Sequence, residues 1–262
     1  MDSSLPDSTQ PSDLADLTLP SELLTGPLTA LGLDPEVLIP RFQLFYQLLL
    51  EANQRMNLTR ITGAEAFCHK HLLDSLSILP ELPDNTVTLL DVGTGGGIPG
   101  LPLWLARPTL QLSLLDSVVK KLKVIDGMVE ALIQRFPELG AHQPRTLHLR
   151  AEDAGHAPEH RQVYDAVIAR AVAPLPVLAE LCLPLVKRTG VFIAMKGPSY
   201  ESETDGLSQI CGLLGARLDR VRELEIGGEQ RVLLVFEKRS LTPRTLPRPP
   251  GQAKRKPLNE FI

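Results

Sequence analysis

A glycine-rich segment directly behind an apolar run constrains the fold of this chain more than any other feature. Residues 89–103 are LLDVGTGGGIPGLPL, with five glycines and two prolines. A turn of this composition between a buried strand and a helix lets a ligand approach the backbone closely, and it is typical of parallel α/β sheets. We therefore expect a strand that ends near Val92 and a helix that begins at Pro99.

The chain beyond this turn continues the same rhythm. Short apolar runs alternate with helical patterns, which indicates an α/β fold with a parallel sheet. Strands are expected over residues 87–92, 110–116, 145–150, 164–170 and 190–196, and an antiparallel edge strand over 231–238. Further helices are expected over 118–136, 174–187 and 201–214.

Two helices are expected before the sheet. Asp34 and Pro35 form a typical helix start, and apolar residues then recur at helical spacing, at Leu38, Phe42, Phe45 and Leu49. A second helix is expected over residues 64–79. The chain thus has four expected parts: a disordered N-terminus (1–20), a helical N-terminal extension (21–84), the sheet domain (85–238) and a basic, proline-rich tail (239–262).

Basic residues gather in that tail although the whole chain has a net charge of −4. No acid lies between residues 238 and 256, while the tail holds Arg244, Arg248, Lys254, Arg255 and Lys256. Such a segment can neutralise phosphates, so we expect it to bind RNA. A solvated tail without a partner is the open alternative.

Several classes of protein and of site are not expected. No stretch is long and apolar enough to span a membrane, and the acidic N-terminus is no secretory signal, so a cytoplasmic protein is predicted. The three cysteines are scattered, without the paired spacing of a zinc site. His69 and His71 lack a third ligand, so we expect no metal there and instead polar contacts between the helical extension and the sheet domain.

The glycine turn distinguishes between cofactors. Residues 95–100 match G-x-G-x-x-G, but Asp91 would repel a pyrophosphate and Pro99 lacks the N–H that an anion needs. S-adenosylmethionine (SAM) has no phosphate and carries a cationic ammonium, which Asp91 can attract. Gly93, Gly95 and Gly97 would let the backbone lie against it. Asp91 as a helix cap is the open alternative.

Two later strand ends add acidic residues at the same edge. Asp116 ends the second strand, where a carboxylate accepts both ribose hydroxyls of a nucleoside. Ala151, Glu152 and Asp153 follow the third strand, where the adenine would lie; a solvated turn is the alternative for this acidic pair. The sequence therefore predicts a SAM site in the crevice at the carboxyl ends of the strands.

The motifs and nucleophiles that are absent from the strand ends limit the chemical class of the methyl acceptor. No Asn/Asp-Pro-Pro-aromatic motif follows residues 164–170, and Cys182 and Cys211 lie in apolar helical surroundings, so neither is expected to be a nucleophile. The strand ends offer Arg170 and Lys196, two candidates for positioning, and no base, so the catalytic residue stays unassigned. A ring nitrogen with a free lone pair, such as N7 of guanine, needs no base, and alignment alone can then accelerate transfer.

Six motifs in order resemble one known family. FYQLLLEANQRMNLTRIT, HKHLLDSLSI, LLDVGTGGGIPGLPL, LLDSVVKKLKVI, RAED and YDAVIARAVAPL are similar to the RsmG (GidB) family of 16S ribosomal RNA guanine-N7 methyltransferases, over about residues 37–238. The resemblance implies a Rossmann-like SAM-dependent methyltransferase sheet with helices on both faces and a small helical N-terminal extension. It also implies a guanine in the 530-loop region of small-subunit RNA as the substrate. Its SAM contacts carry over to Gly93, Ile98, Asp116, Ser117, Ala151, Glu152 and Arg170.

The substrate side follows from RNA geometry. Side chains cannot reach N7 in the deep, narrow groove of A-form RNA, so the guanine must be unpaired or flipped out. Lys196 would lie near it, and Tyr200 would stack on it or cap the next helix. We expect a monomer whose partner is 16S ribosomal RNA or the small ribosomal subunit. The alternatives are a non-catalytic SAM-binding protein of RNA or ribosome assembly and a SAM enzyme for small molecules.

Overall fold

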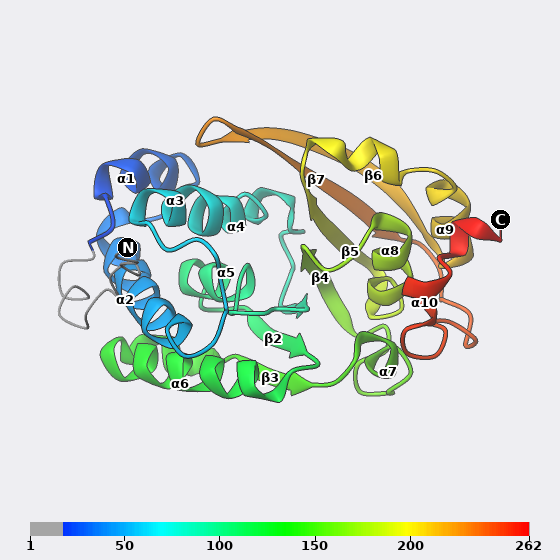
Figure 1. Ribbon diagram of the computed structural model, residues 1–262, viewed down its shortest axis with the longest axis horizontal. Coiled ribbons are helices and arrows are strands. Elements are labelled where there is room, and N and C mark those ends of the chain that lie inside the picture. Colours follow the sequence, from blue (N-terminus) through cyan, green and yellow to red (C-terminus); the bar gives the residue numbers. More distant parts are fainter. Residues whose placement is uncertain (1–17, 262) are drawn as a thin grey trace, which may run out of the picture.

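The computed structural model describes residues 18–261 (Figure 1). The expected disordered N-terminus therefore lies outside the described residues up to residue 17. Leu19 is buried, and its N–H donates to Oε1 of Gln43 at 2.7 Å. Within residues 18–261, no helix is long and apolar enough to cross a membrane.

A seven-stranded sheet forms the centre of the molecule, in the order β3-β2-β1-β4-β5-β7-β6. The parallel strands β1 to β5 are Thr88–Val92, Gln111–Asp116, Arg145–His148, Tyr164–Arg170 and Val186–Lys196; β6 (Ala216–Ile226) and β7 (Glu229–Lys238) are antiparallel. The strand order reverses between β1 and β4, where α/β sheets bind their ligands. The expected Rossmann-like α/β fold is confirmed.

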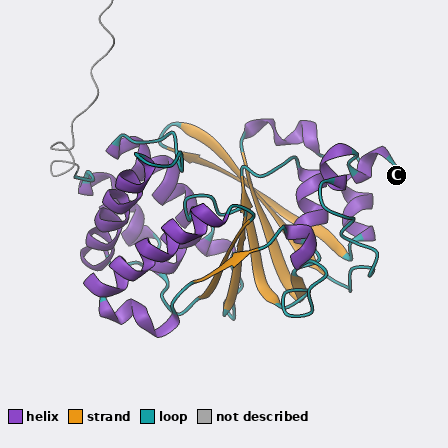
Figure 2. Ribbon diagram, turned by 60° about the horizontal axis from the view of Figure 1, so that its bottom comes forward, coloured by secondary structure: helices purple, strands orange, loops and turns teal. Residues whose placement is uncertain are grey.

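Helices cover both faces of this sheet (Figure 2). One face packs against α5 (Gly100–Ala106) and α6 (Val119–Arg135), and the other against α8 (Leu175–Cys182) and α9 (Leu207–Leu213). Strand β4 is buried on both sides, which explains its continuous apolar run. Ala166 and Ile168 belong to the first core, while Val167 and Ala169 belong to the second.

The N-terminal helices extend the first core. They are α1 (Ser21–Ala30), α2 (Pro35–Asn53), α3 (Ala64–Phe67), the π-helix η2 (Cys68–Leu73) and α4 (Asp74–Leu76). The predicted start of α2 is confirmed, because the Asp34 side chain accepts a hydrogen bond from the Glu36 N–H at 2.9 Å. Its expected apolar face is also confirmed, since Leu38, Phe42, Phe45 and Leu49 are all buried.

The antiparallel strands differ from the prediction. Strand β7 is antiparallel as expected, but it lies between β5 and β6 and is not the edge. The edge strand β6 was missed because charged residues alternate with few apolar ones, as in ARLDRVRELEI, and only Ala216 of this strand is buried. An exposed edge strand carries little apolar signal.

Two predicted helices are shorter than expected. Helix α8 ends at Cys182, since Pro184 follows and has no backbone N–H to continue the helical hydrogen bonds. The chain then enters the eleven-residue strand β5. Residues 201–214 do not form one helix: the 3-10 helix η5 (Pro198–Glu203) and α9 are separated at Gly206, whose φ is 66°.

Residues 239–261, here called the C-terminal segment, pack against the sheet domain. The Lys238 side chain is fully buried and donates to the Leu214 carbonyl at 2.6 Å and to Oγ1 of Thr242. The segment contains α10 (Gln252–Arg255) and the 3-10 helix η6 (Leu258–Glu260), and Figure 1 shows it beside α7 (Ala151–Ala154) and α8. The alternative of a fully solvated tail is thus wrong, because Leu246, Ala253 and Leu258 are buried.

Candidate functional site

The glycine turn adopts backbone conformations that require glycine. Gly93, Gly95 and Gly97 have φ values of 74°, 59° and 85°, in the left-handed region. The N–H groups of Gly93 and Thr94 both donate to the Leu115 carbonyl, at 2.8 and 3.1 Å, which fastens the turn to β2. A Cβ on Gly93 would lie 2.7 Å from Cγ2 of Val172, so a side chain there would overlap Val172.

A crevice of about 310 Å³ opens at the carboxyl ends of β1 and β2. Five of the residues expected to bind SAM line it together: Gly93, Asp116, Ser117, Ala151 and Glu152. The other five, Asp91, Gly95, Gly97, Ile98 and Arg170, are not on its walls. The crevice therefore brings together the residues predicted for the ribose and the adenine, whereas four of the five residues predicted in and before the glycine turn do not line it.

The two carboxylates on the wall are already oriented. Asp116 accepts from the Gly95 N–H at 3.0 Å and from the Val118 N–H at 2.9 Å. Glu152 accepts from the Gly251 N–H at 2.8 Å. Each carboxylate keeps unused lone pairs, so it can also accept from a ligand hydroxyl or amine.

Asp91 is fully buried behind the turn. Its Oδ2 accepts from Oγ1 of Thr94 at 2.6 Å and from the Gly100 N–H at 3.0 Å, so it does bond to the first residue of α5, as the alternative prediction held. Its Oδ1 has no hydrogen-bond partner among the described residues. Burial raises the pKa of this carboxyl to about 6. A buried, half-unsatisfied negative charge is an environment that favours a nearby cation.

A second cavity, of about 400 Å³, lies next to the crevice. Arg170 and Lys196 both line it, and Ala171 lines both cavities, so the two meet at the end of β4. Ala171 has a φ of 57°, which is rare for a residue with a Cβ and is typical of functional sites. The sequence placed Arg170 with the cofactor, but its side chain faces this second cavity.

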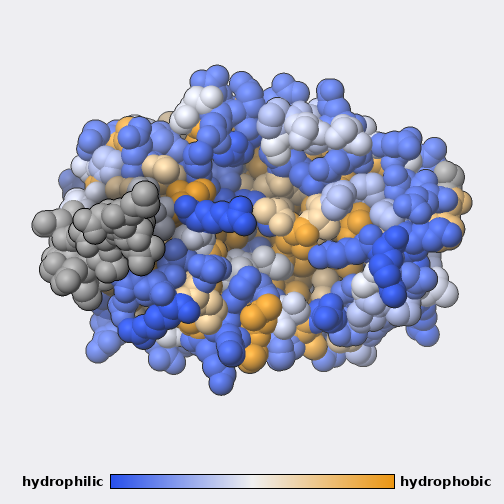
Figure 3. Space-filling view, viewed as in Figure 1, coloured by the Kyte–Doolittle hydropathy of each residue, from blue (hydrophilic) through white to orange (hydrophobic). Residues whose placement is uncertain are grey.

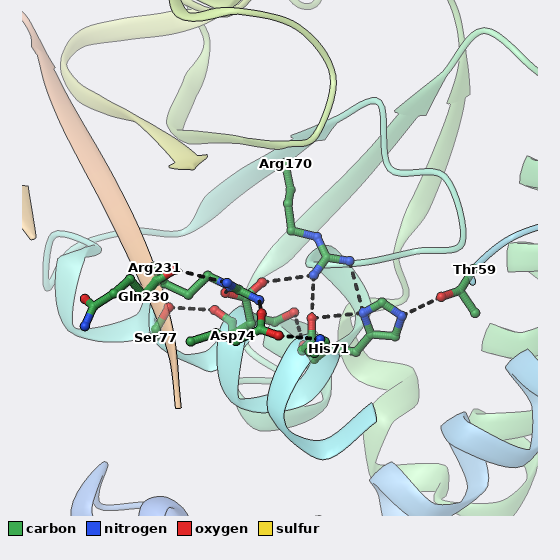
Figure 4. Close-up of polar contacts among 10 residues, drawn as sticks. Thr59, His71, Asp74, Ser77, Arg170, Gln230 and Arg231 are labelled. Atoms are coloured by element: carbon green, nitrogen blue, oxygen red, sulfur yellow. Dashed lines mark hydrogen bonds and ion pairs between the residues drawn. The ribbon is translucent and has the colours of Figure 1, made fainter. Parts of the chain in front are cut away.

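Arg170 is held by the N-terminal helices (Figure 4). It donates to Oδ2 of Asp74 at 3.0 Å and to the Lys70 carbonyl at 2.8 Å, and it lies 3.2 Å from Nδ1 of His71. Arg231 of β7 approaches the same Asp74 carboxylate at 3.3 Å. The predicted polar contact with the sheet domain is thus found for His71 but not for His69, whose buried Nδ1 has no hydrogen-bond partner among the described residues.

His71 and Asp74 are both engaged. Nε2 of His71 lies 2.7 Å from Oγ1 of Thr59, and Nδ1 lies 3.0 Å from the Lys70 carbonyl. Burial and the Arg170 charge lower the pKa of His71 to about 4, so the imidazole is neutral at pH 7. Burial raises the pKa of Asp74, while Arg170 and Arg231 oppose this shift.

Lys196 and Tyr200 are less free than expected. The Lys196 ammonium donates to the Ala173 carbonyl at 2.8 Å and to Oε2 of Glu203 at 2.5 Å. Tyr200 lies within η5, half-buried against the second core, and it is not on the wall of the second cavity. Stacking of Tyr200 on a base stays a prediction.

The basic residues of the C-terminal segment divide into two groups. Arg248 forms an ion pair with the fully buried Glu180, so its predicted role in RNA binding is wrong for the conformation seen here. The remaining four, Arg244, Lys254, Arg255 and Lys256, are exposed, and Lys254 lines the cofactor crevice. All four stay candidates for phosphate contacts.

Sequence reasoning missed His71, Asp74 and Arg231 as members of the second cavity. The spacing of His71 and Asp74 was a usable signal, because residues three apart on a helix share one face. Arg231 gave no signal, since β7 was expected at the sheet edge. Within residues 18–261, no group of three or more His, Cys, Asp and Glu residues could hold a metal.

Comparison with known proteins agrees with these motifs. A family model described as "GidB: rRNA small subunit methyltransferase G" matches residues 38–233. Three proteins named "Ribosomal RNA small subunit methyltransferase G" are similar: those of Pelotomaculum thermopropionicum (40% identity; 84% of this chain, 90% of that protein), Lactobacillus acidophilus (39%; 84% and 90%) and Alkaliphilus metalliredigens (42%; 82% and 88%). The chain therefore belongs to the GidB family, rRNA small subunit methyltransferase G, which its sequence motifs resemble.

Proposed function

We propose that this chain transfers a methyl group from SAM to N7 of a guanine in 16S ribosomal RNA. The family and the names of its relatives support a methyltransferase that acts on ribosomal RNA of the small subunit. The observation that carries the proposal is the meeting of two cavities at Ala171. One has carboxylates oriented for a nucleoside, and the other has cations around a space for an acceptor.

The crevice residues suit SAM. When bound, SAM supplies a methyl group on a positively charged sulfur. Asp116 and Glu152 would accept hydrogen bonds from the ribose and the adenine, and the glycines would let the backbone lie against the ligand. The Asp91 charge would stabilise the ammonium, which fits the unpaired Oδ1 of this buried carboxylate.

The second cavity suits an acceptor that has no proton to lose. His71 is a weak base because its pKa is lowered to about 4, and the Asp74 carboxylate is bound to Arg170 and Arg231. No other carboxylate, imidazole or thiol among the described residues lines this cavity. N7 of guanine carries its own lone pair, so a strong base is not needed.

Positioning is then the main contribution of the chain. Methyl transfer to N7 breaks the carbon–sulfur bond as the carbon–nitrogen bond forms, and no proton leaves the base. Arg170, held by Asp74 and the Lys70 carbonyl, would fix the acceptor in line with the methyl group. Lys196, at the end of β5, would contact the acceptor in the same cavity.

The RNA backbone would reach the cavity from its mouth. Lys70 pairs with Glu229 at 2.5 Å, and their side chains are 38% and 42% exposed. Such surface pairs contribute little stability, so Lys70 can exchange Glu229 for a phosphate. The guanine must be unpaired or flipped to enter. A monomer that works in the cytoplasm, as expected from the sequence, stays a prediction.

Transfer of a labelled methyl group from SAM tests the proposal. Purified small subunits, deproteinised 16S RNA and a mixture of small metabolites would be offered separately, and the labelled base would be mapped by cleavage at N7-methylguanine. We expect one labelled guanine in the RNA and none with Arg170→Ala. Label in metabolites alone would favour a small-molecule enzyme, and SAM binding without any transfer would favour a non-catalytic protein.

A further inference from the structure

The C-terminal segment is built into the same core as α8. Leu246, Ala253 and Leu258 are buried in the second core, although the segment is rich in proline and basic residues. Figure 1 shows it, in red, running beside α8 and reaching α7. The family model ends at residue 233, so this segment lies beyond the part of the chain that the model matches.

Charged side chains of the sheet domain fasten the segment. Arg248 donates through Nε to Oε1 of Glu180 at 2.8 Å and through Nη2 to Oε2 at 2.5 Å, and its own N–H adds a third bond at 2.9 Å. Glu180 lies fully buried in α8. Arg161 donates to three carbonyls of the segment, those of Thr242, Pro243 and Leu246.

A buried bidentate pair fixes position more than it adds stability. The two parallel bonds set the orientation of Arg248 relative to α8. Without Arg248, Glu180 would be an uncompensated buried charge, so one docked position of the segment is favoured. This pair stands three residues before Gly251, where the segment meets the cofactor crevice.

The seated segment forms part of the crevice wall. Gly251 and Lys254 line the crevice together with Asp116 and Glu152. The Gly251 N–H donates to Oε1 of Glu152, so the segment also orients the carboxylate assigned to the adenine side. Lys254 is exposed, and none of the described residues forms a hydrogen bond or an ion pair with its ammonium.

We propose that the C-terminal segment is the outer wall of the SAM site, with Lys254 as a further cofactor-binding residue and Arg248 as a positioning residue. The inference rests on the proposed function, because it takes SAM as the ligand. It moves Lys254 from the RNA surface to the cofactor. Since a ligand that contacts only the seated segment favours that state, SAM binding and segment docking are coupled in both directions.

Two substitutions and a control in the full-length protein test the proposal. Lys254→Ala removes the ammonium from the crevice, and Arg248→Gln releases Glu180. Gln252→Ala is the matched control, because Gln252 lies in the same helix, is exposed and does not line the crevice. Calorimetry measures the Kd for SAM, and trypsin cleavage within residues 239–256 measures docking.

We expect both test variants to raise the Kd about tenfold or more, the loss expected for one charge-assisted hydrogen bond, and the control to leave it unchanged. SAM should slow cleavage of the segment in the wild type, and Arg248→Gln should speed cleavage without SAM. A purely structural Arg248 would change cleavage but not the Kd.

Wild-type affinity in the Lys254→Ala variant, with no protection of the wild-type segment by SAM, would overturn the proposal even if Arg248→Gln fails to fold. This outcome is distinct from failure of the proposed function, because there the wild-type protein itself would not bind SAM and both ideas would be overturned.

Discussion

If Asp91 holds the ammonium of SAM, its buried carboxyl should make SAM affinity depend on pH. Desolvation raises its pKa from 3.8 to about 6, although Thr94 and Gly100 donate hydrogen bonds that oppose this shift. If the ionised form attracts the ammonium of SAM, binding requires deprotonation of Asp91. At pH 5 only about one such carboxyl in eleven is ionised, so affinity should be about tenfold lower than at pH 7, or about 1.4 kcal/mol.

Substitution of Asp91 by asparagine isolates this charge. The amide oxygen keeps an acceptor for Thr94 and Gly100, but the variant cannot ionise. We expect Asp91→Asn to bind SAM about tenfold more weakly at pH 7 and to lose the dependence between pH 5 and 7. Calorimetry at fixed ionic strength measures both. Asp126→Asn, an exposed carboxylate that accepts from Thr146 at 2.9 Å, is the control and should keep the wild-type profile.

The unfolding free energy of the ligand-free protein offers a second test of the Asp91 charge. Because the folded pKa of Asp91 lies above its unfolded value, ionisation costs stability as pH rises from 3.8 through 6, and the cost above that range is about 3 kcal/mol. The unfolding free energy of Asp91→Asn relative to wild type should therefore increase with pH over this window. A wild-type affinity that stays flat from pH 5 to 7 would refute the electrostatic role of Asp91.

Three further predictions concern the turn and the second cavity. Arg170→Ala should lower stability by about 2 kcal/mol, since it removes a charged partner of a buried carboxylate, and should abolish RNA methylation; normal transfer rates would refute the positioning role. Gly93→Ala should lower stability by about 1–3 kcal/mol and weaken SAM binding, because its Cβ would lie 2.7 Å from Val172. The Cβ of Gly95→Ala would meet no atom closer than 3.9 Å, so thermal unfolding should show a smaller loss of stability for this variant. The folded pKa of His71 lies below the unfolded value, so about 3 kcal/mol of stability, present above pH 6.5, should be lost as pH falls to 4. Urea unfolding of His71→Gln, which should lack this dependence, checks it.

The structure also changes how the C-terminal segment can be studied. From the sequence alone, truncation after Lys238 suggests itself as a test of RNA binding by the tail. Because Leu246, Ala253 and Leu258 are buried in the second core, that truncation would remove part of the fold. Substitution of the exposed Arg244, Arg255 and Lys256 is the cleaner test of phosphate contacts.

The sequence by itself determined the features that depend on neighbouring residues. A cluster of glycines after an apolar run predicted the turn, where Gly93, Gly95 and Gly97 do have positive φ. The ends of consecutive parallel strands predicted Asp116 and Glu152 at one edge. These inferences succeed because backbone geometry and strand direction are local properties. Exposed elements gave no such signal, so β6 was missed.

Only the tertiary structure decided which partner each charge meets. Arg170 and Asp74 are 96 residues apart, and Arg248 and Glu180 are 68 apart, so no local pattern links them. In the sequence, Arg170 and Arg248 look like exposed charges that are free to bind the cofactor or a phosphate. Folding buries one member of each pair, and a buried charge must be compensated nearby. Arg248, which the sequence predicted to bind RNA, therefore pairs with Glu180 and holds the C-terminal segment beside the cofactor crevice.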